Sequence, residues 1–208
     1  TVNKVAECAA DIPARMPRDD EWRFTPGAEY VHICTNETIS GAQLKKIPQT
    51  DAPLFADMSS DILSCERDYT RFGLFYAGAQ KNLGPAGMAV VAIRKDLAEK
   101  GAQAIPTLLQ YRTHTSNNSL YNTPPTFAIY VFGEVMKWIK KTGRENLFRL
   151  NREKAQKIYD AIDASGFYCG TALPEFRSDM NVTFRLSRSE VFRFLLSKGP
   201  PSSYVLPP

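Results

Sequence analysis

The chain has 208 residues, 43% of them hydrophobic and 23% charged, which is the composition of a globular protein able to bury one sizeable core. Its net charge of +4 is mild, and no basic run with interleaved aromatic residues appears, so we expect no nucleic-acid partner. It contains no apolar stretch of about 18 residues and opens with no charged-then-apolar signal segment, so we expect no membrane association and a cytoplasmic location.

Short apolar runs bounded by glycine and proline predict strands, which follow an irregular segment over residues 1–29. The expected strands cover residues 30–34, 53–56, 74–76 and 88–93. Residues 39–47 are expected to form a turn or a short helix, residues 96–100 a short helical turn, and residues 106–118 a polar loop.

Two longer helices are expected, over residues 125–141 and 145–164, each ended near a glycine. The first carries an apolar stripe at helical spacing that predicts core or interface packing. The stripe consists of Phe127, Val131, Val135, Trp138 and Ile139. Residues 181–186 alternate like the first strand of a second, smaller α+β unit, whose boundary is expected between Gly143 and Gly166.

The cysteines and histidines point away from disulfide and metal chemistry. Four widely spaced cysteines without a C-x-x-C pair favour reduced thiols in a reducing compartment. They are Cys8, Cys34, Cys65 and Cys169. His32 and His114 are the only histidines, too few and too isolated for a zinc site. Because His32 lies in an apolar run, we expect it to be a hydrogen-bonded core residue rather than a catalyst.

The most informative stretch is the glycine-rich segment around Lys81, between the apolar runs 74–76 and 88–93. It predicts a lysine held in a tight turn between two core strands. Burial disfavours a charged ammonium, and only a neutral amine attacks a carbonyl, so this setting suits covalent chemistry at Lys81. Small neighbours leave room for a bulky group against the backbone. The alternative is a surface lysine in a hairpin turn.

Asp57 ends the apolar run 53–56 and lies upstream of Lys81. A carboxylate at the end of one core strand and a lysine at the end of another fit a pyridoxal phosphate site. There the lysine forms the internal aldimine, and the aspartate keeps the pyridine nitrogen protonated so that the ring absorbs the electrons of a substrate carbanion. The alternative is an ordinary capping aspartate at a strand end.

Four segments, in the same order along the chain, resemble the phosphoserine aminotransferases, members of the class-V, fold-type-I pyridoxal phosphate enzymes. Residues 76–87, with Ala79-Gln80-Lys81-Asn82 at their centre, look like the family's lysine signature. The other segments are residues 30–41, 56–64 and 120–127, and the resemblance runs from about residue 1 to about residue 186. It implies an α/β fold whose large domain has a mainly parallel central sheet flanked by helices, followed by part of a smaller C-terminal α+β domain.

The resemblance also implies roles for individual residues, with pyridoxal 5'-phosphate as cofactor. Lys81 would form the aldimine and move the proton at the substrate α-carbon, and Asp57 would pair with the pyridine nitrogen. The remaining cofactor-binding residues would contact the ring oxygen or the phosphate. They are Thr38 on the phenolic oxygen, Ser59 and Gln80 on the phosphate, and Asn122 and Thr123 on the phosphate of the neighbouring subunit.

Each of these polar residues also has a purely structural alternative. Thr38 and Ser59 could be ordinary turn residues. Asn122 and Thr123 precede Pro124-Pro125 and could form only a helix N-cap with proline in the first turn. The start of a helix is also a natural anion site, so capping and phosphate binding are compatible.

The implied activity is transfer of an amino group between L-glutamate and 3-phosphohydroxypyruvate, giving O-phospho-L-serine and 2-oxoglutarate in L-serine biosynthesis by a homodimer with shared active sites. Residues 1–143 would be part of the cofactor-binding large domain, with the helix 125–141 leading towards a partial small domain over 144–198 and a loose tail over 199–208. Another fold-type-I enzyme, such as a serine–glyoxylate aminotransferase or a cysteine desulfurase, is a rival that the Asn122-Thr123-Pro124-Pro125 segment argues against.

Two departures from the family pattern affect the expected activity. The chain starts partway through the expected large domain, without the family's glycine-rich phosphate loop or the tryptophan that stacks on the cofactor. After residue 185 the family's arginine segments for the substrate phosphate and carboxylate do not appear. The alternative function is therefore a non-catalytic fragment that only dimerises or binds pyridoxal phosphate weakly.

Overall fold

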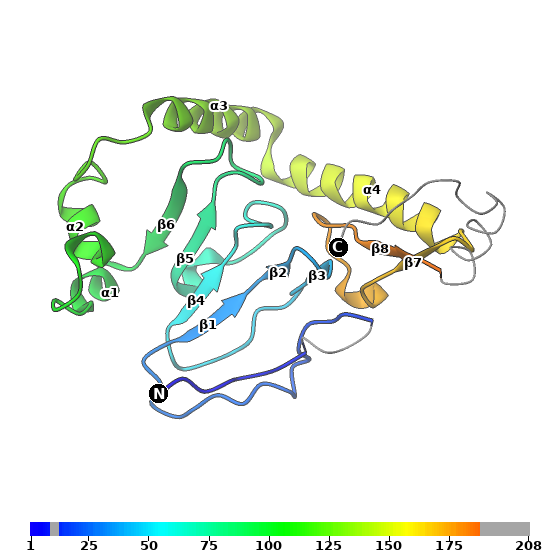
Figure 1. Ribbon diagram of the computed structural model, residues 1–208, viewed down its shortest axis with the longest axis horizontal. Helices are drawn as coiled ribbons and strands as arrows, with labels where there is room; N and C mark the ends of the chain where they lie inside the picture. Colours follow the sequence, from blue (N-terminus) through cyan, green and yellow to red (C-terminus); the bar gives the residue numbers. More distant parts are fainter. Residues whose placement is uncertain (9–12, 188–208) are drawn as a thin grey trace, which may run out of the picture.

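The computed structural model describes residues 1–8 and 13–187, and its centre is a four-stranded sheet (Figure 1). The strand order is β1-β4-β5-β6, with β1 at Val31–Cys34, β4 at Leu54–Asp57, β5 at Phe72–Gly78 and β6 at Ala89–Ile93. β1, β4 and β5 are parallel, and β6 runs antiparallel to β5 at the edge of the sheet. The strands predicted from the apolar runs are confirmed, with β5 extending further on both sides than expected.

Alternation along the strands divides the sheet into a buried face and a less covered face. Val31, Ile33, Leu54, Ala56 and Ala77 are all at most 5% exposed and form one hydrophobic core. Because successive side chains of a strand point to opposite faces, their neighbours in sequence lie on the other face. The less covered face therefore includes the polar side chains at the ends of β1 and β4.

A short antiparallel hairpin follows β1, with β2 at Asn36–Glu37 and β3 at Ala42–Gln43. The expectation of a turn or short helix over 39–47 is correct for the turn and wrong for the helix. Gly41, at φ +72°, closes the turn, and its N–H donates to Glu37 O at 2.9 Å. A Cβ on Gly41 would overlap Thr183 Oγ1, so the hairpin conformation depends on a distant segment that local sequence patterns do not reveal.

One short helix lies between β4 and β5, and the other helices follow the sheet along the chain. They are η1 (Tyr69–Arg71), α1 (Lys95–Lys100), η2 (Thr107–Leu109), α2 (Tyr111–Ser116), α3 (Thr126–Thr142), α4 (Arg144–Asp163) and η3 (Pro174–Phe176). The predicted helical turn at 96–100 and both long helices are confirmed. The predicted polar loop at 106–118 is wrong, because it contains η2 and α2. Side chains in this segment donate hydrogen bonds to backbone carbonyls. Arg112, for example, donates to Glu99 O and Gly101 O.

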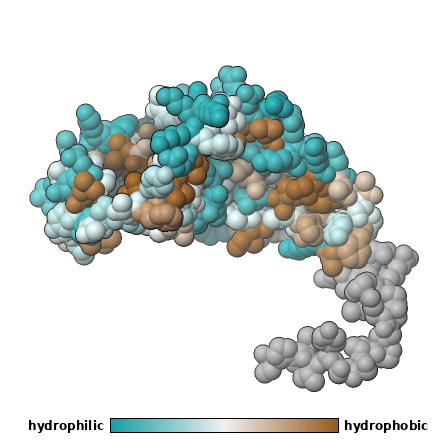
Figure 2. Space-filling model, turned by 90° about the horizontal axis from the view of Figure 1, so that it is seen from above, coloured by the Kyte–Doolittle hydropathy of each residue, from teal (hydrophilic) through white to brown (hydrophobic). Residues whose placement is uncertain are grey.

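The apolar stripe predicted on α3 is only partly buried. Ile139 is buried, but Phe127 is 76% exposed and Trp138 54% exposed. The helix contacts the core of the sheet through Phe132 and Met136 instead. The helical period was therefore predicted correctly, whereas part of the stripe faces outward. Seen from the side of α3 and α4, apolar patches interrupt a hydrophilic surface (Figure 2).

A second, smaller sheet follows α4. Its two strands, β7 (Tyr168–Gly170) and β8 (Phe184–Leu186), form an antiparallel sheet separate from the first. α4 lies against β7, and buried Ala155, Tyr159 and Ile162 of α4 form a small cluster of their own. The strand expected over 181–186 is found in its second half, as β8. The predicted loose tail at 199–208 lies outside the described residues.

Candidate active site

The carboxyl ends of the three parallel strands meet at one edge of the sheet. Asp57 is the last residue of β4, and it pairs in register with Cys34 of β1 and Tyr76 of β5. This edge is where open α/β sheets commonly bind ligands, because the turns after neighbouring strands converge there. The predicted position of Asp57 at a strand end is therefore correct.

The turn after β4 is tied to the end of β5. The Ser59 N–H donates to Asp57 Oδ1 at 2.8 Å, and the Ser59 hydroxyl accepts from the Gly78 N–H at 3.1 Å. Met58 N also donates to Tyr76 O at 2.8 Å. These bonds orient the Asp57 carboxylate and place the Ser59 hydroxyl directly beside the backbone of Gly78.

A buried ion pair stabilises this turn. Asp61 is fully buried, and Arg67 donates to its Oδ2 at 2.5 Å from a side chain that is only 3% exposed. Thr35 Oγ1 donates to Oδ1 at 2.5 Å and Gln43 Nε2 to Oδ2 at 3.1 Å. Because a buried charge is stable only when paired and hydrogen-bonded, these partners fix the position of the turn relative to the β2–β3 hairpin.

Lys81 lies in the loop between β5 and β6 and contacts the hairpin. Its Nζ donates to Thr38 Oγ1 at 2.6 Å. The loop is fixed by Leu83, which is 1% exposed, and by Asn82, whose Nδ2 donates to Ile62 O at 2.7 Å. The expectation of a lysine buried between two core strands is wrong, because Lys81 is exposed. The physical reason is that β6 is an edge strand with no buried residue, so the loop that leads into it stays open on one side.

Gln80 folds back over Gly78. A Cβ built on Gly78 would lie 2.6 Å from Gln80 Oε1 and 2.9 Å from its Nε2, so glycine leaves the space that the amide occupies. The Gln80 amide and the Ser59 hydroxyl are thus both adjacent to Gly78. This cluster is uncharged and rich in donors, as phosphate binding without a competing charge requires.

Asn122 and Thr123 are not brought to these residues. Both are exposed, in the connection between α2 and α3, and in the described part of the chain neither hydrogen-bonds to another candidate residue. The capping alternative is wrong, because the N-cap of α3 is Pro125, without a side-chain hydrogen bond. The helix begins only at Thr126, so neither Asn122 nor Thr123 occupies the N-cap position.

Two residues of the sheet were not predicted to belong to the site. Tyr76 lies beside Asp57, and His32 Nε2 is 3.1 Å from Tyr76 Oη. Burial raises the pKa of the Tyr76 phenol, and the charge of the neighbouring Asp57 raises that pKa further. His32 is hydrogen-bonded as expected, but it is exposed rather than part of the core. The one sign of this in the sequence is strand alternation. His32 and Cys34 are two residues apart and therefore lie on the same face of the sheet, which is the face of Asp57.

The described residues bring together groups suited to covalent chemistry. An amine, a carboxylate, hydroxyls and an amide lie together at the carboxyl edge of the sheet, whereas no group of three or more His, Cys, Asp or Glu side chains in residues 1–8 and 13–187 could hold a metal ion. Within the same residues, no helix is long and apolar enough to span a membrane.

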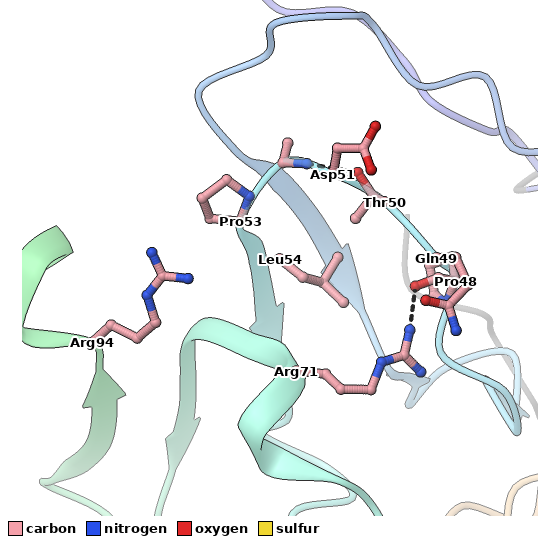
Figure 3. A pocket seen from close by; sticks show the side chains of 9 residues that line it. Pro48, Gln49, Thr50, Asp51, Pro53, Leu54, Arg71 and Arg94 are labelled. Atoms are coloured by element: carbon pink, nitrogen blue, oxygen red, sulfur yellow. Dashed lines mark hydrogen bonds between the residues drawn. The ribbon is translucent and has the colours of Figure 1, made fainter.

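A cavity of about 310 Å³ lies at the opposite end of β4, and it contains none of the candidate residues (Figure 3). Residues 48–54 line it together with Arg71 and Arg94. Arg71 donates to Ile47 O and Pro48 O, and Arg94 pairs with Asp96 at 2.7 Å. Because both guanidinium groups are already engaged, this cavity is a poorer anion site than the strand ends.

Comparison with known proteins places these features in a family. The model of the aminotransferase class-V family matches residues 11–199. Phosphoserine aminotransferase of Lysinibacillus sphaericus (strain C3-41) is 50% identical over 206 residues, covering 93% of this chain and 57% of the relative. That of Niallia circulans is 49% identical over 193 residues, covering 91% and 53%. The chain thus spans about half the length of the curated relatives it matches.

Comparison with solved structures leads to the same group of enzymes. Phosphoserine aminotransferase from Bacillus circulans subsp. alkalophilus superposes with a TM-score of 0.81 at 50% identity, over 88% of this chain and 52% of that one. PLP-bound phosphoserine aminotransferase from Trichomonas vaginalis gives 0.84 at 41% identity, over 91% and 56%. The predicted α/β fold with a mainly parallel sheet is confirmed.

Proposed function

The chain belongs to the aminotransferase class-V family, and on this premise we propose that it serves amino-group transfer between L-glutamate and 3-phosphohydroxypyruvate, in L-serine biosynthesis in the cytoplasm. The products would be O-phospho-L-serine and 2-oxoglutarate. The two relatives that are 50% and 49% identical in sequence are named phosphoserine aminotransferase. The observation that carries the proposal is the Lys81–Thr38 contact at 2.6 Å beside the turn that orients Asp57.

The residues present fit pyridoxal 5'-phosphate. An exposed amine at Lys81 and a carboxylate at Asp57 provide the two groups that the cofactor's aldehyde and ring nitrogen need. The hydroxyl of Ser59 and the amide of Gln80, both adjacent to Gly78, are suited to the phosphate. When bound, this cofactor supplies an electron sink for the bonds of the substrate α-carbon.

Lys81 would hold the cofactor through Nζ and then act as the acid and base at the substrate α-carbon. Its exposure suits this role, because the amine must exchange one partner for another during a turnover. Thr38 Oγ1 would keep Nζ oriented and donate to the ring oxygen of the cofactor. Asp57, held by the Ser59 N–H, would keep a proton on the ring nitrogen.

Replacing Lys81 tests the covalent role without relying on turnover. Wild-type protein incubated with pyridoxal phosphate and reduced with borohydride should carry the cofactor on the peptide that contains Lys81, as found by mass spectrometry. Lys81→Ala should remain unlabelled there and lose the visible absorbance of the bound cofactor, and nearly all transamination should be lost. The control is Lys154→Ala, at an exposed lysine of α4, which should label like wild type. Labelling of Lys81→Ala at wild-type yield would refute the assignment.

Asp57→Asn separates binding from proton removal. This variant should still bind the cofactor, because Thr38, Ser59 and Gln80 are unchanged. Exchange of the α-proton of glutamate with deuterated solvent should slow by several powers of ten, since a neutral ring nitrogen is a poorer electron sink. An unchanged exchange rate would mean that Asp57 only caps β4.

We also propose that the active form is a homodimer in which Asn122 and Thr123 reach the partner's cofactor phosphate. Their exposure and the exposed Phe127 and Trp138 on α3 support this placement. Mixing Lys81→Ala with Asn122→Ala subunits should restore activity, because one of the two sites of a mixed dimer has both groups intact. Failure of verified mixed dimers to recover activity would place Asn122 outside the partner's site.

The division of the chain is part of the same proposal. Residues 1–143 would form part of the cofactor-binding domain, and residues 144–198 part of a second domain. The separate β7–β8 sheet and the bend at Gly143, with φ +81° between α3 and α4, support a boundary there.

Adding purified 3-phosphohydroxypyruvate and glutamate to the 208-residue chain tests the activity directly. Glutamate-dependent turnover that requires the phosphate, and is absent with unphosphorylated 3-hydroxypyruvate or glyoxylate, supports the proposal. Cofactor binding without any turnover would favour a non-catalytic role of this chain.

A further inference from the structure

We propose that Asn36 and Asn181 are positioning residues for Thr38, and that the chain after α4 thereby helps to arrange the cofactor site. Asn36 begins β2, two residues before Thr38, whereas Asn181 lies 145 positions further along the chain, shortly before β8. This inference rests on the proposed function, because Thr38 is assigned there to the ring oxygen of the cofactor.

The side-chain amide of Asn36 is buried and joins three segments of the chain. Only 2% of Asn36 is exposed. Its Nδ2 donates to Ser60 Oγ at 2.8 Å and to Asn181 Oδ1 at 2.6 Å. Its Oδ1 accepts from Ser178 Oγ at 2.5 Å. One side chain therefore connects the β2–β3 hairpin to the turn after β4 and to residues 178–181.

The positions of the protons fix the orientation of this amide. The Ser178 hydroxyl accepts from the backbone N–H groups of Met180 and Asn181, both at 3.0 Å. A hydroxyl has two lone pairs and one proton, so the proton of Ser178 is left for Asn36 Oδ1. The NH₂ group of Asn36 must then face Ser60 and Asn181, and its two protons match these two acceptors. Because each polar atom of the Asn36 amide has a partner, removing one partner leaves a buried group unpaired.

Further contacts from the chain after α4 reach the tip of the same hairpin, at residues 40–41 (Figure 1). Thr38 therefore lies between two anchors, the Asn36 amide before it and the tip after it. Because β2 and β3 have only two residues each, the place of Thr38 Oγ1, 2.6 Å from Lys81 Nζ, depends on both anchors. The contacts at the tip are hydrogen bonds to backbone carbonyls, from Ser178 N to Gly41 O at 2.9 Å and from the hydroxyls of Thr171 and Thr183 to Ser40 O at 3.0 Å each.

Replacement of Asn181 tests this arrangement at a position that is only partly buried. Asn181→Leu removes the acceptor for Asn36 while keeping a side chain of similar size. The dissociation constant for pyridoxal phosphate, from absorbance titration, should rise about twofold to tenfold, as for one lost hydrogen bond, and the visible absorption maximum should shift. Asn181→Asp keeps an oxygen acceptor and should retain the wild-type values. So should the control Asn146→Leu, which removes an exposed asparagine that donates to Thr142 O.

A double-mutant cycle with Thr38→Val shows whether Asn181 acts through Thr38. If it does, adding Asn181→Leu to Thr38→Val should lower the affinity little further, whereas independent effects would add. Thermal unfolding without cofactor measures folding separately, and Asn181→Ala carries the same test if leucine prevents folding. Full additivity, or a loss of stability with unchanged affinity and spectrum, would overturn the inference.

Acetylation of Lys81 gives a readout that needs no cofactor. Because Thr38 Oγ1 accepts from Lys81 Nζ, displacement of Thr38 should free the amine. Acetic anhydride should therefore modify Lys81 about twofold to tenfold faster in both Thr38→Val and Asn181→Leu than in wild type, measured by mass spectrometry relative to the exposed Lys154. A wild-type rate in Asn181→Leu would overturn the inference. Wild-type protein that binds no pyridoxal phosphate would instead overturn the proposed function.

Discussion

The buried Asp61–Arg67 pair makes the strongest prediction about stability. Asp61 is fully buried, Arg67 is 3% exposed, and the carboxylate also accepts from Thr35 and Gln43. Asp61→Ala would leave the guanidinium buried without its partner, and breaking such a pair costs about 3–5 kcal/mol. A typical domain is stable by roughly 5–15 kcal/mol, so the variant should lose a large fraction of its free energy of unfolding.

Urea unfolding followed by circular dichroism measures this loss against a matched control. Glu134→Ala removes an exposed partner of Lys137, with side chains 47% and 75% exposed, and should cost less than about 1 kcal/mol. The double variant Asp61→Leu/Arg67→Met removes both charges and should be more stable than Asp61→Ala alone, because no unpaired charge remains. A cost for Asp61→Ala no larger than that of Glu134→Ala would refute the reasoning, as would a double variant less stable than the single one.

Three further changes follow from individual contacts. Gly78→Ala should displace the Gln80 amide, because its oxygen lies 2.6 Å from the position of the new Cβ. The affinity for pyridoxal phosphate, measured by titration, should fall about tenfold, and an unchanged affinity would contradict this prediction. Gly133 lies inside α3, and a Cβ added there would meet nothing within 4 Å. Because glycine destabilises a helix interior relative to alanine, Gly133→Ala should raise the free energy of unfolding in urea by about 0.5–1 kcal/mol. A decrease would contradict this prediction. Hydrogen bonding to Arg15 lowers the pKa of Glu21 from 4.5 to about 2, so its stabilising contribution is present above pH 4.5 and is lost as the pH falls towards 2. Acid unfolding of Glu21→Gln should be flatter over that range than the wild-type curve.

Local patterns in the sequence were sufficient to predict the strands of the four-stranded sheet, the long helices and the places of Asp57 and Lys81 along the chain. Apolar runs bounded by glycine and proline predicted β1, β4, β5 and β6, because a buried strand needs a short apolar run and a turn needs conformational freedom. The same runs placed Asp57 at the end of β4 and Lys81 in the loop after β5. The resemblance to a family then supplied roles that no single motif carries.

Only the tertiary structure decided which of these residues meet. Lys81 contacts Thr38, 43 positions earlier, because the register of the parallel strands and the tight turn at Gly41 bring the hairpin to the strand ends. The exposure of Lys81 depends on β6 being an edge strand, and the contact of His32 with Tyr76 depends on β1 and β5 both flanking β4. Periodicity along a chain reports which face a side chain takes, whereas the neighbour it meets on that face is set by strand order and register, which are properties of the whole sheet.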